Sequence, residues 1–243
     1  MPQSFDQTMH EMLAQTRAVL SELKSLGVDE LYLENDSTEL PVCREEVSQC
    51  QTGRCDCRMP SLEEIRAELG ECQRCGLARG RTNIVFGSGN PHAELVFVGE
   101  GPGREEDEKG LPFVGEAGRL LERILFAMGF QRDQVYICNV VKCRPPQNRN
   151  PQADEIAACE PFLKQQLASL KPRVIVALGK FAAQTLLQQE TPISRLRGHW
   201  SEYEGIPLMP TYHPAYLLRN PAGKRDVWED MKAVMLHLAE ESK

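Results

Sequence analysis

The sequence lacks the features that would direct it into a membrane or out of the cell. No stretch of its 243 residues is apolar for long enough to cross a bilayer. The first six residues, Met-Pro-Gln-Ser-Phe-Asp, have neither the basic start nor the apolar core of a secretory signal. We therefore expect a cytoplasmic protein that has no contact with a membrane.

The sequence also lacks the excess of positive charge that many nucleic-acid-binding proteins have, since its net charge is −7. Residues 1–60 account for most of the deficit, with five Lys and Arg against eleven Asp and Glu, which leaves the remainder of the chain at −1. Phosphate contacts depend on the local field, so nucleic acid is not excluded. Basic residues lie in the loops that we consider below: Lys142, Arg144, Arg149, Arg195, Arg197, Arg219, Lys224 and Arg225.

Cysteine, in contrast, is abundant. Disulfides seldom persist in the cytosol, and nine cysteines cannot all pair within one chain. Two residues separate Cys72 from Cys75, and fifteen residues separate Cys143 from Cys159. Four such thiolates can hold either a [4Fe–4S] cluster or a structural zinc ion, and the spacing does not choose between them. Cys138, inside a predicted strand, is expected to be a small buried apolar residue.

The chain divides into an extension and a main domain. Residues 1–60 contain a predicted amphipathic helix over 4–26, followed by a polar, acidic linker. The linker cysteines match no metal-site spacing, and we expect this extension to be a tether or an arm that binds a partner protein: Cys43, Cys50, Cys55 and Cys57. The main domain is expected to span residues 61–243.

Strands and helices alternate along the main domain. The near-continuous apolar strands predict a parallel sheet with helices on both faces, an α/β fold of three layers, α/β/α, around four parallel strands. The strands are predicted over 94–99, 134–141, 174–179 and 206–212, and the helices over 117–128, 153–170, 181–188 and from 224 onward. Ligands bind beyond the carboxyl ends of such strands, where the loops 99–115, 139–151, 179–181 and 211–221 would meet.

Three of these loops contain residues suited to a flat, polar ligand. Phe113, held between Pro and Gly, is either a stacking platform or a core anchor for its loop. Asn139 ends a strand and presents a donor and an acceptor, unless it is an ordinary turn residue. His213 precedes a proline at the end of the last strand, where its imidazole either faces the crevice or has a structural role.

Taken together, the motifs GEGPG, GLPFVG, NVVKCRPP and HPAYLLR resemble those of the uracil-DNA glycosylase superfamily, and of its type 4, iron–sulfur branch in particular. The resemblance covers roughly residues 62–240. It implies a monomeric enzyme that removes uracil from single- and double-stranded DNA after flipping the base out. It also implies a [4Fe–4S] cluster on four of the cysteines: Cys72, Cys75, Cys143 and Cys159.

The same resemblance implies roles for the loop residues. Phe113 would stack on uracil, Asn139 would pair with its polar edge, and His213 would donate to its O2 atom. Gly99, Glu100 and Gly101 would line the pocket. Another branch of the superfamily has an Asp at the position of Gly101, so a different carboxylate must orient the water. Glu106 is favoured over Asp107 for this task.

Three alternatives remain open on the sequence. The enzyme could also remove other deaminated bases, such as hypoxanthine or xanthine. The chain could be a non-catalytic DNA-binding module that senses redox state through its cluster. It could also be a zinc-ribbon protein that binds nucleic acid.

Overall fold

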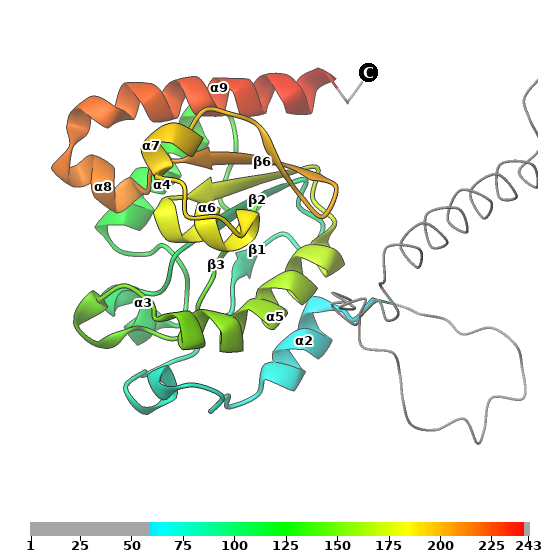
Figure 1. Ribbon diagram of the computed structural model, residues 1–243. Coiled ribbons are helices and arrows are strands. Elements are labelled where there is room, and N and C mark those ends of the chain that lie inside the picture. Colours follow the sequence, from blue (N-terminus) through cyan, green and yellow to red (C-terminus); the bar gives the residue numbers. More distant parts are fainter. Residues whose placement is uncertain (1–58, 241–243) are drawn as a thin grey trace, which may run out of the picture. The chain divides into compact units, whose positions relative to one another are not determined.

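The computed structural model describes residues 59–240, which form a sheet with helices on both faces (Figure 1). The predicted helix over 4–26 and the four linker cysteines lie outside the described residues. Within residues 59–240, no helix is both long and apolar enough to cross a bilayer.

Within the same range the sheet has six strands, in the order β1-β3-β2-β4-β6-β5. The four central strands are parallel, as the sequence predicts. Two edge strands pair antiparallel with them, and the expected four-stranded sheet is therefore part of a larger mixed one. The edge strands span two and three residues, too short to show a strand period in the sequence. The strands are β1 (Ser88–Gly89), β2 (Leu95–Gly99), β3 (Tyr136–Asn139), β4 (Val174–Leu178), β5 (Ser201–Tyr203) and β6 (Ile206–Thr211).

The central strands are apolar on both faces because both faces are covered. In β2, Val96 and Val98 point into one core cluster, whereas Leu95 and Phe97 point into the other. This alternation is the period of two that a pleated strand imposes.

Four of the helices match their predicted bounds to within one residue, whereas the short helices over 104–109, 193–196 and 214–219 were not predicted. The first helix of the described residues follows a capping box, in which the Ser61 hydroxyl accepts a hydrogen bond from the Glu64 N–H and the Glu64 carboxylate accepts one from the Ser61 N–H. The α-helices are α2 (Leu62–Leu69), α3 (Arg104–Lys109), α4 (Glu116–Ala127), α5 (Ala153–Leu170), α6 (Lys180–Leu187), α7 (Ile193–Leu196), α8 (Pro214–Arg219) and α9 (Lys224–Glu240). Short 3-10 helices are η1 (Gly76–Arg79), η2 (Pro146–Asn148) and η3 (Pro221–Gly223).

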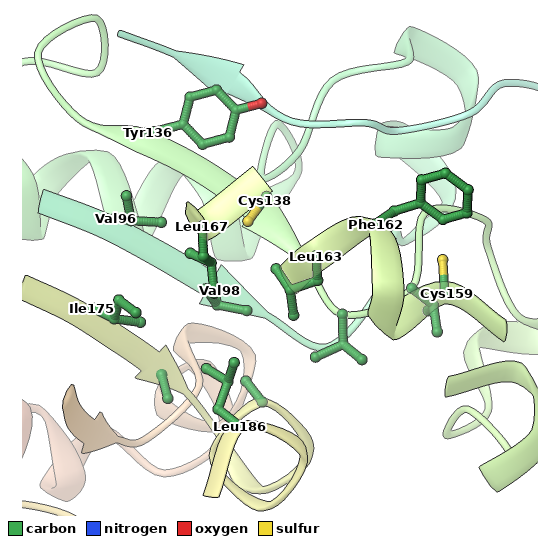
Figure 2. Close-up of a cluster of buried hydrophobic side chains, with 14 of the residues drawn as sticks. Val96, Val98, Tyr136, Cys138, Cys159, Phe162, Leu163, Leu167, Ile175 and Leu186 are labelled. Carbon is green, nitrogen blue, oxygen red and sulfur yellow. The ribbon is translucent and has the colours of Figure 1, made fainter. Parts of the chain in front are cut away.

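The two faces of the sheet are covered by different helices. Buried side chains of α2, α5 and α6 pack on one face, and those of α4, α8 and α9 pack on the other. In the first cluster, Phe162, Leu163 and Leu167 of α5 lie with Val96 and Val98 of β2 (Figure 2). The two cores fix the strands, so the loops at their carboxyl ends emerge from a rigid base.

Candidate active site

A cavity of about 430 Å³ opens beyond the carboxyl ends of β2, β3 and β6. Three of the four predicted loops contribute to its lining, and the fourth, around Gly179, lies behind His213. The volume lies within the usual range for a small-molecule pocket. Six of the residues predicted from the sequence line it: Glu100, Gly101, Glu106, Phe113, Asn139 and His213.

Asn139 has an unpaired polar group beside this cavity. It is the last residue of β3, and only 1% of its surface is exposed. Its Oδ1 atom has no hydrogen-bond partner within the described residues. An unpaired buried acceptor costs about 1–3 kcal/mol. A ligand with an N–H donor at this position would remove that cost.

Gly99 lies directly behind Asn139 and Phe113. A Cβ atom at residue 99 would be 2.4 Å from Asn139 Oδ1 and 2.6 Å from the Phe113 ring. Glycine is therefore required at this position for both side chains to approach the end of β2. The signal was present in the sequence as the first glycine of GEGPG.

Phe113 is held in a strained backbone conformation by its neighbours. Its φ is +52°, which is uncommon for a residue other than glycine. The Arg132 guanidinium donates to the carbonyl oxygens of Phe113 and Pro112. The ring is buried, and its centroid lies 5.5 Å from that of the His213 imidazole, with the two planes tilted by 31°. Phe113 is thus both an anchored residue and part of the cavity wall.

His213 is the N-cap of α8, and its Nδ1 atom accepts a hydrogen bond from the Ala215 N–H at 3.1 Å. The imidazole must therefore have its proton on Nε2 when neutral. Burial lowers the pKa of His213 to about 4, so the neutral form prevails near pH 7. Gly179, with φ +90°, leaves room for this side chain, since a Cβ there would be 2.9 Å from that of His213.

The two candidate water-positioning carboxylates lie in different surroundings. Glu106 lines the cavity, and its Oε1 atom accepts hydrogen bonds from the Val114 and Gly115 N–H groups. Asp107 is buried and instead accepts hydrogen bonds from the Thr82 and Asn83 N–H groups. Asp107 is not among the residues that line the cavity.

A third carboxylate, Glu100, also faces the cavity. Burial raises its pKa to about 7, so its charge changes near neutral pH. The shift results from desolvation, which disfavours the ionised form of a carboxyl group.

Several of the basic residues in these loops are bound within the protein. The buried Lys142 ammonium donates to the Asn139 carbonyl at 2.7 Å and to Gln166 Oε1 at 2.5 Å. It therefore cannot contact a phosphate. Arg197 binds the buried Asp230 carboxylate. Arg219, in contrast to Lys142 and Arg197, lines the cavity.

The four predicted cysteine ligands meet at a second, small cavity. Cys72, Cys75, Cys143 and Cys159 all line it, although they come from two segments far apart in the sequence. All four are free thiols. Within residues 59–240, no three His, Cys, Asp or Glu side chains are close enough together to hold a single metal ion.

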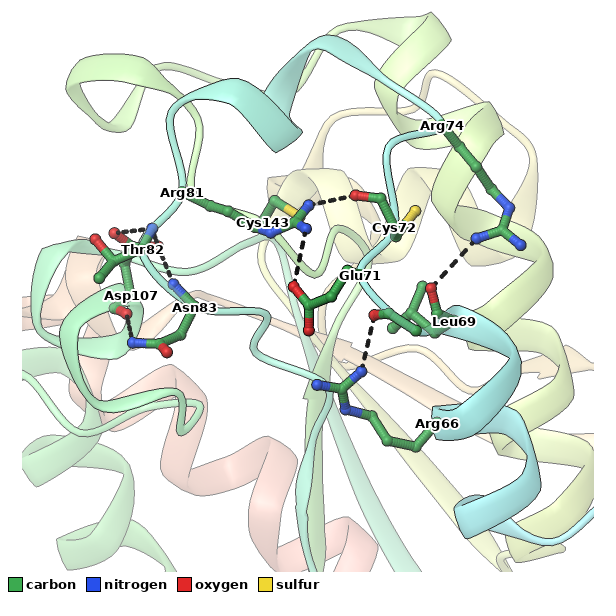
Figure 3. Close-up of polar contacts among 11 residues, drawn as sticks. Arg66, Leu69, Glu71, Cys72, Arg74, Arg81, Thr82, Asn83, Asp107 and Cys143 are labelled. Atoms are coloured by element: carbon green, nitrogen blue, oxygen red, sulfur yellow. Dashed lines mark hydrogen bonds and ion pairs between the residues drawn. The ribbon is translucent and has the colours of Figure 1, made fainter.

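Arg81, which the sequence did not single out, also belongs to this cavity. Its Nη1 atom donates to the Cys72 carbonyl at 2.5 Å and approaches Cys143 Sγ at 3.5 Å (Figure 3). The Lys142 backbone N–H donates to Cys159 Sγ at 3.3 Å. Hydrogen bonds from cationic and backbone donors are typical of the surroundings of thiolate ligands.

The sequence model of the uracil DNA glycosylase superfamily matches residues 86–232. This range contains every residue that lines the larger cavity, which Asn139, Phe113 and His213 share. A type-4 uracil-DNA glycosylase of Archaeoglobus fulgidus is 45% identical over 184 residues, which cover 72% of this chain and 92% of that protein. One of Thermotoga maritima is 46% identical over 175 residues, 70% of this chain and 91% of that protein. A type-5 uracil-DNA glycosylase of Pyrobaculum aerophilum is 32% identical over 146 residues, 53% of this chain and 64% of that protein.

Proposed function

This chain belongs to the uracil DNA glycosylase superfamily, and we propose that it hydrolyses the N-glycosidic bond of uracil in DNA, which releases free uracil and leaves an abasic site. The observation that carries the proposal is the cavity in which Asn139, Phe113 and His213 meet. The active domain is residues 61–243, with residues 1–60 as an extension.

The cavity suits a single base that has left the helix. An enzyme that acts on a base inside a duplex must extrude the nucleotide. Extruding a base from a single strand costs less free energy, because no base pair is broken. Phe113 supplies an aromatic surface and Asn139 an amide that pairs with the uracil edge. The unpaired Asn139 Oδ1 suits the uracil N3–H, whereas cytosine has no proton at that atom. Cytosine is therefore rejected, because it leaves the buried amide oxygen unpaired.

Catalysis rests on stabilising separated charge. As the glycosidic bond breaks, negative charge grows on uracil O2 and positive charge on the sugar. The neutral His213 imidazole donates its Nε2–H to O2, because its Nδ1 atom is already occupied by the Ala215 N–H. One oriented donor of this kind contributes about 3–4 kcal/mol to a transition state.

Glu106 orients the attacking water. Its Oε1 atom is engaged by two backbone N–H groups, which leaves Oε2 without a hydrogen bond within the described residues. That oxygen lies towards Gly103, where a Cβ would be 2.7 Å away, on the lining of the cavity. A carboxylate held by one oxygen and open at the other is suited to accept a hydrogen bond from water.

The four cysteines around the small cavity would hold a [4Fe–4S] cluster. Burial raises the pKa of the Cys143 thiol to about 11, so its thiolate needs a bound cationic group to be stable. Four thiols and an N–H donor at two of them fit such a group. When bound, the cluster supplies iron–thiolate bonds that join the loop after β3 to residues 72–75. No redox change of the cluster is required for base release.

The proposal is tested with a labelled oligonucleotide that contains one uracil, incubated with the anaerobically purified protein and then treated with alkali. Strand cleavage at uracil, and not at thymine or cytosine in matched oligonucleotides, is expected. Cleavage at hypoxanthine or xanthine as well would indicate a broader glycosylase. Binding without cleavage, by protein with its full content of iron, would contradict the proposal and favour a DNA-binding module.

A further inference from the structure

A segment of three residues, Arg81 to Asn83, joins the cysteine cavity to α3 (Figure 3). At one end, the Arg81 side chain is only 9% exposed and binds Cys72 and Cys143. Its second nitrogen forms an ion pair with Glu71 at 3.6 Å. The guanidinium therefore fixes this end of the segment against both cysteine-bearing parts of the chain.

At the other end, the segment and α3 bind each other reciprocally. The Asp107 carboxylate accepts hydrogen bonds from the Thr82 N–H at 2.9 Å and from the Asn83 N–H at 3.4 Å. The Asn83 side chain donates to the Asp107 carbonyl at 2.8 Å and to the Glu108 carbonyl at 3.1 Å. Asp107 itself is 2% exposed, whereas Thr82 and Asn83 are exposed, so only the Asp107 side of these contacts is buried.

The position of α3 matters because the helix is short and carries a residue of the pocket. A helix of six residues is not stable on its own, and tertiary contacts must set its place. Glu106, next to Asp107, binds the Val114 and Gly115 N–H groups at 2.9 and 2.8 Å. Glu106 thereby holds the loop that follows Phe113.

We infer that Asp107 is a positioning residue for base release. It anchors α3 to a segment that Arg81 joins to the cysteine site, and so it keeps Glu106 and the loop after Phe113 in their positions at the pocket. The inference rests on the proposed function and extends it. It gives the cysteine site a mechanical link to the base pocket through contacts between neighbouring residues, without any redox change.

The first test compares Asp107→Asn with Glu108→Gln, an exposed neighbour on the same helix whose carboxylate pairs with Arg104. The amide keeps one acceptor oxygen but replaces the other with an NH2 donor that faces the Thr82 N–H, which weakens the anchor while keeping the shape of the side chain. A displacement of about 1 Å at reacting groups can cost about 100-fold in rate. Single-turnover uracil release by Asp107→Asn is therefore expected to fall about 10- to 100-fold, with DNA affinity and iron content unchanged. Glu108→Gln should behave as the wild type does.

A second measurement, amide hydrogen exchange, follows the connection from Arg81 through Asp107 to the loop after Phe113. Amide hydrogen exchange at Val114 and Gly115 should speed up in Asp107→Asn, because Glu106 no longer holds these groups firmly. Arg81→Met should also speed it up, and should lose iron to a chelator faster than the wild type. If Asp107→Asn does not fold, Asn83→Ala removes the two side-chain bonds to α3 and serves for the same measurements.

A double-mutant cycle decides the outcome. When two residues act through one path, the double variant loses less activity than the product of the two single losses. The inference predicts that Arg81→Met combined with Asp107→Asn releases uracil no more slowly than Asp107→Asn alone. It is overturned if the two losses multiply, or if Asp107→Asn releases uracil and exchanges amides as the wild type does. A wild type that releases no uracil would instead overturn the proposed function, and amide exchange would still test the link.

Discussion

His213 and Ala215 are joined by a hydrogen bond in which the imidazole accepts and the backbone N–H donates, over 3.1 Å. This bond settles which ring nitrogen of the neutral imidazole has the proton. It also opposes protonation of the ring, since a second proton would have to displace the Ala215 N–H. The remaining donor of the His213 ring is therefore a neutral Nε2–H.

The role of His213 predicts a loss of rate that does not depend on pH near neutrality. His213→Ala should lower single-turnover uracil release by about 100- to 1,000-fold, with little change in DNA affinity. Because burial lowers the pKa of His213 to about 4, the loss should be the same at about pH 6 and about pH 8. His92→Ala, at an exposed histidine outside the cavity, is the control. A loss that grows as the pH falls below 7 would contradict a neutral donor.

Gly99 predicts a steric effect on the same pocket. Gly99→Ala places a methyl group 2.4 Å from Asn139 Oδ1 and 2.6 Å from the Phe113 ring, so both side chains must move. Uracil release is expected to fall by about 100-fold. Gly80→Ala is the matched control, because a Cβ there meets nothing within 4 Å. Equal rates for the two variants would show that the close approach at Gly99 is not needed.

Glu100 predicts a dependence of stability on pH. Its folded pKa of about 7 lies above the ordinary value of 4.5, so the native state binds more protons between these values than the unfolded state does. The wild type should lose stability as the pH rises from about 4.5 to about 7. Glu100→Gln removes this loss, and should raise the free energy of unfolding by about 1–2 kcal/mol at about pH 8, a figure reduced for partial exposure.

Urea unfolding of wild type and Glu100→Gln at two pH values checks this prediction. The difference should disappear near pH 4.5, where the Glu100 carboxyl is protonated in the native state. A difference that is constant with pH would mean that the substitution acts through packing and not through the charge.

The cysteines predict a selective loss of iron. Cys143→Ser removes a ligand from the small cavity, whereas Cys138→Ala changes a buried cysteine of β3 that does not line it. Iron and zinc per chain should be measured in both variants and in the wild type. We expect iron in the wild type and in Cys138→Ala, and a loss in Cys143→Ser. Zinc in place of iron would contradict the cluster.

The sequence predicted the parts of the fold that show a clear pattern. The continuous apolar runs of β2 and β4 marked the buried strands, and the bounds of α5 were predicted to the residue. The edge strands β1 and β5 were missed because they are too short to alternate. Six of the residues that line the cavity followed from the loop motifs, since the parallel topology brings strand ends together.

The sequence did not predict the contacts between side chains and backbone groups. Nothing in the pattern distinguishes the buried Asp107, bound to backbone N–H groups, from its exposed neighbour Glu108. Likewise, Lys142 is a loop lysine by sequence, yet it is buried and binds Asn139 and Gln166. Such partners come from distant segments, and they depend on packing that local spacing does not encode.

The central claim is that this chain breaks the bond between uracil and deoxyribose. The most direct measurement is the release of labelled free uracil from uracil-containing DNA in a single turnover, with the integrity of the strand followed before alkali treatment. The account predicts one free uracil for each site and an intact strand that alkali then cleaves. Strand scission without free uracil, or no release by protein that holds its iron, would contradict it.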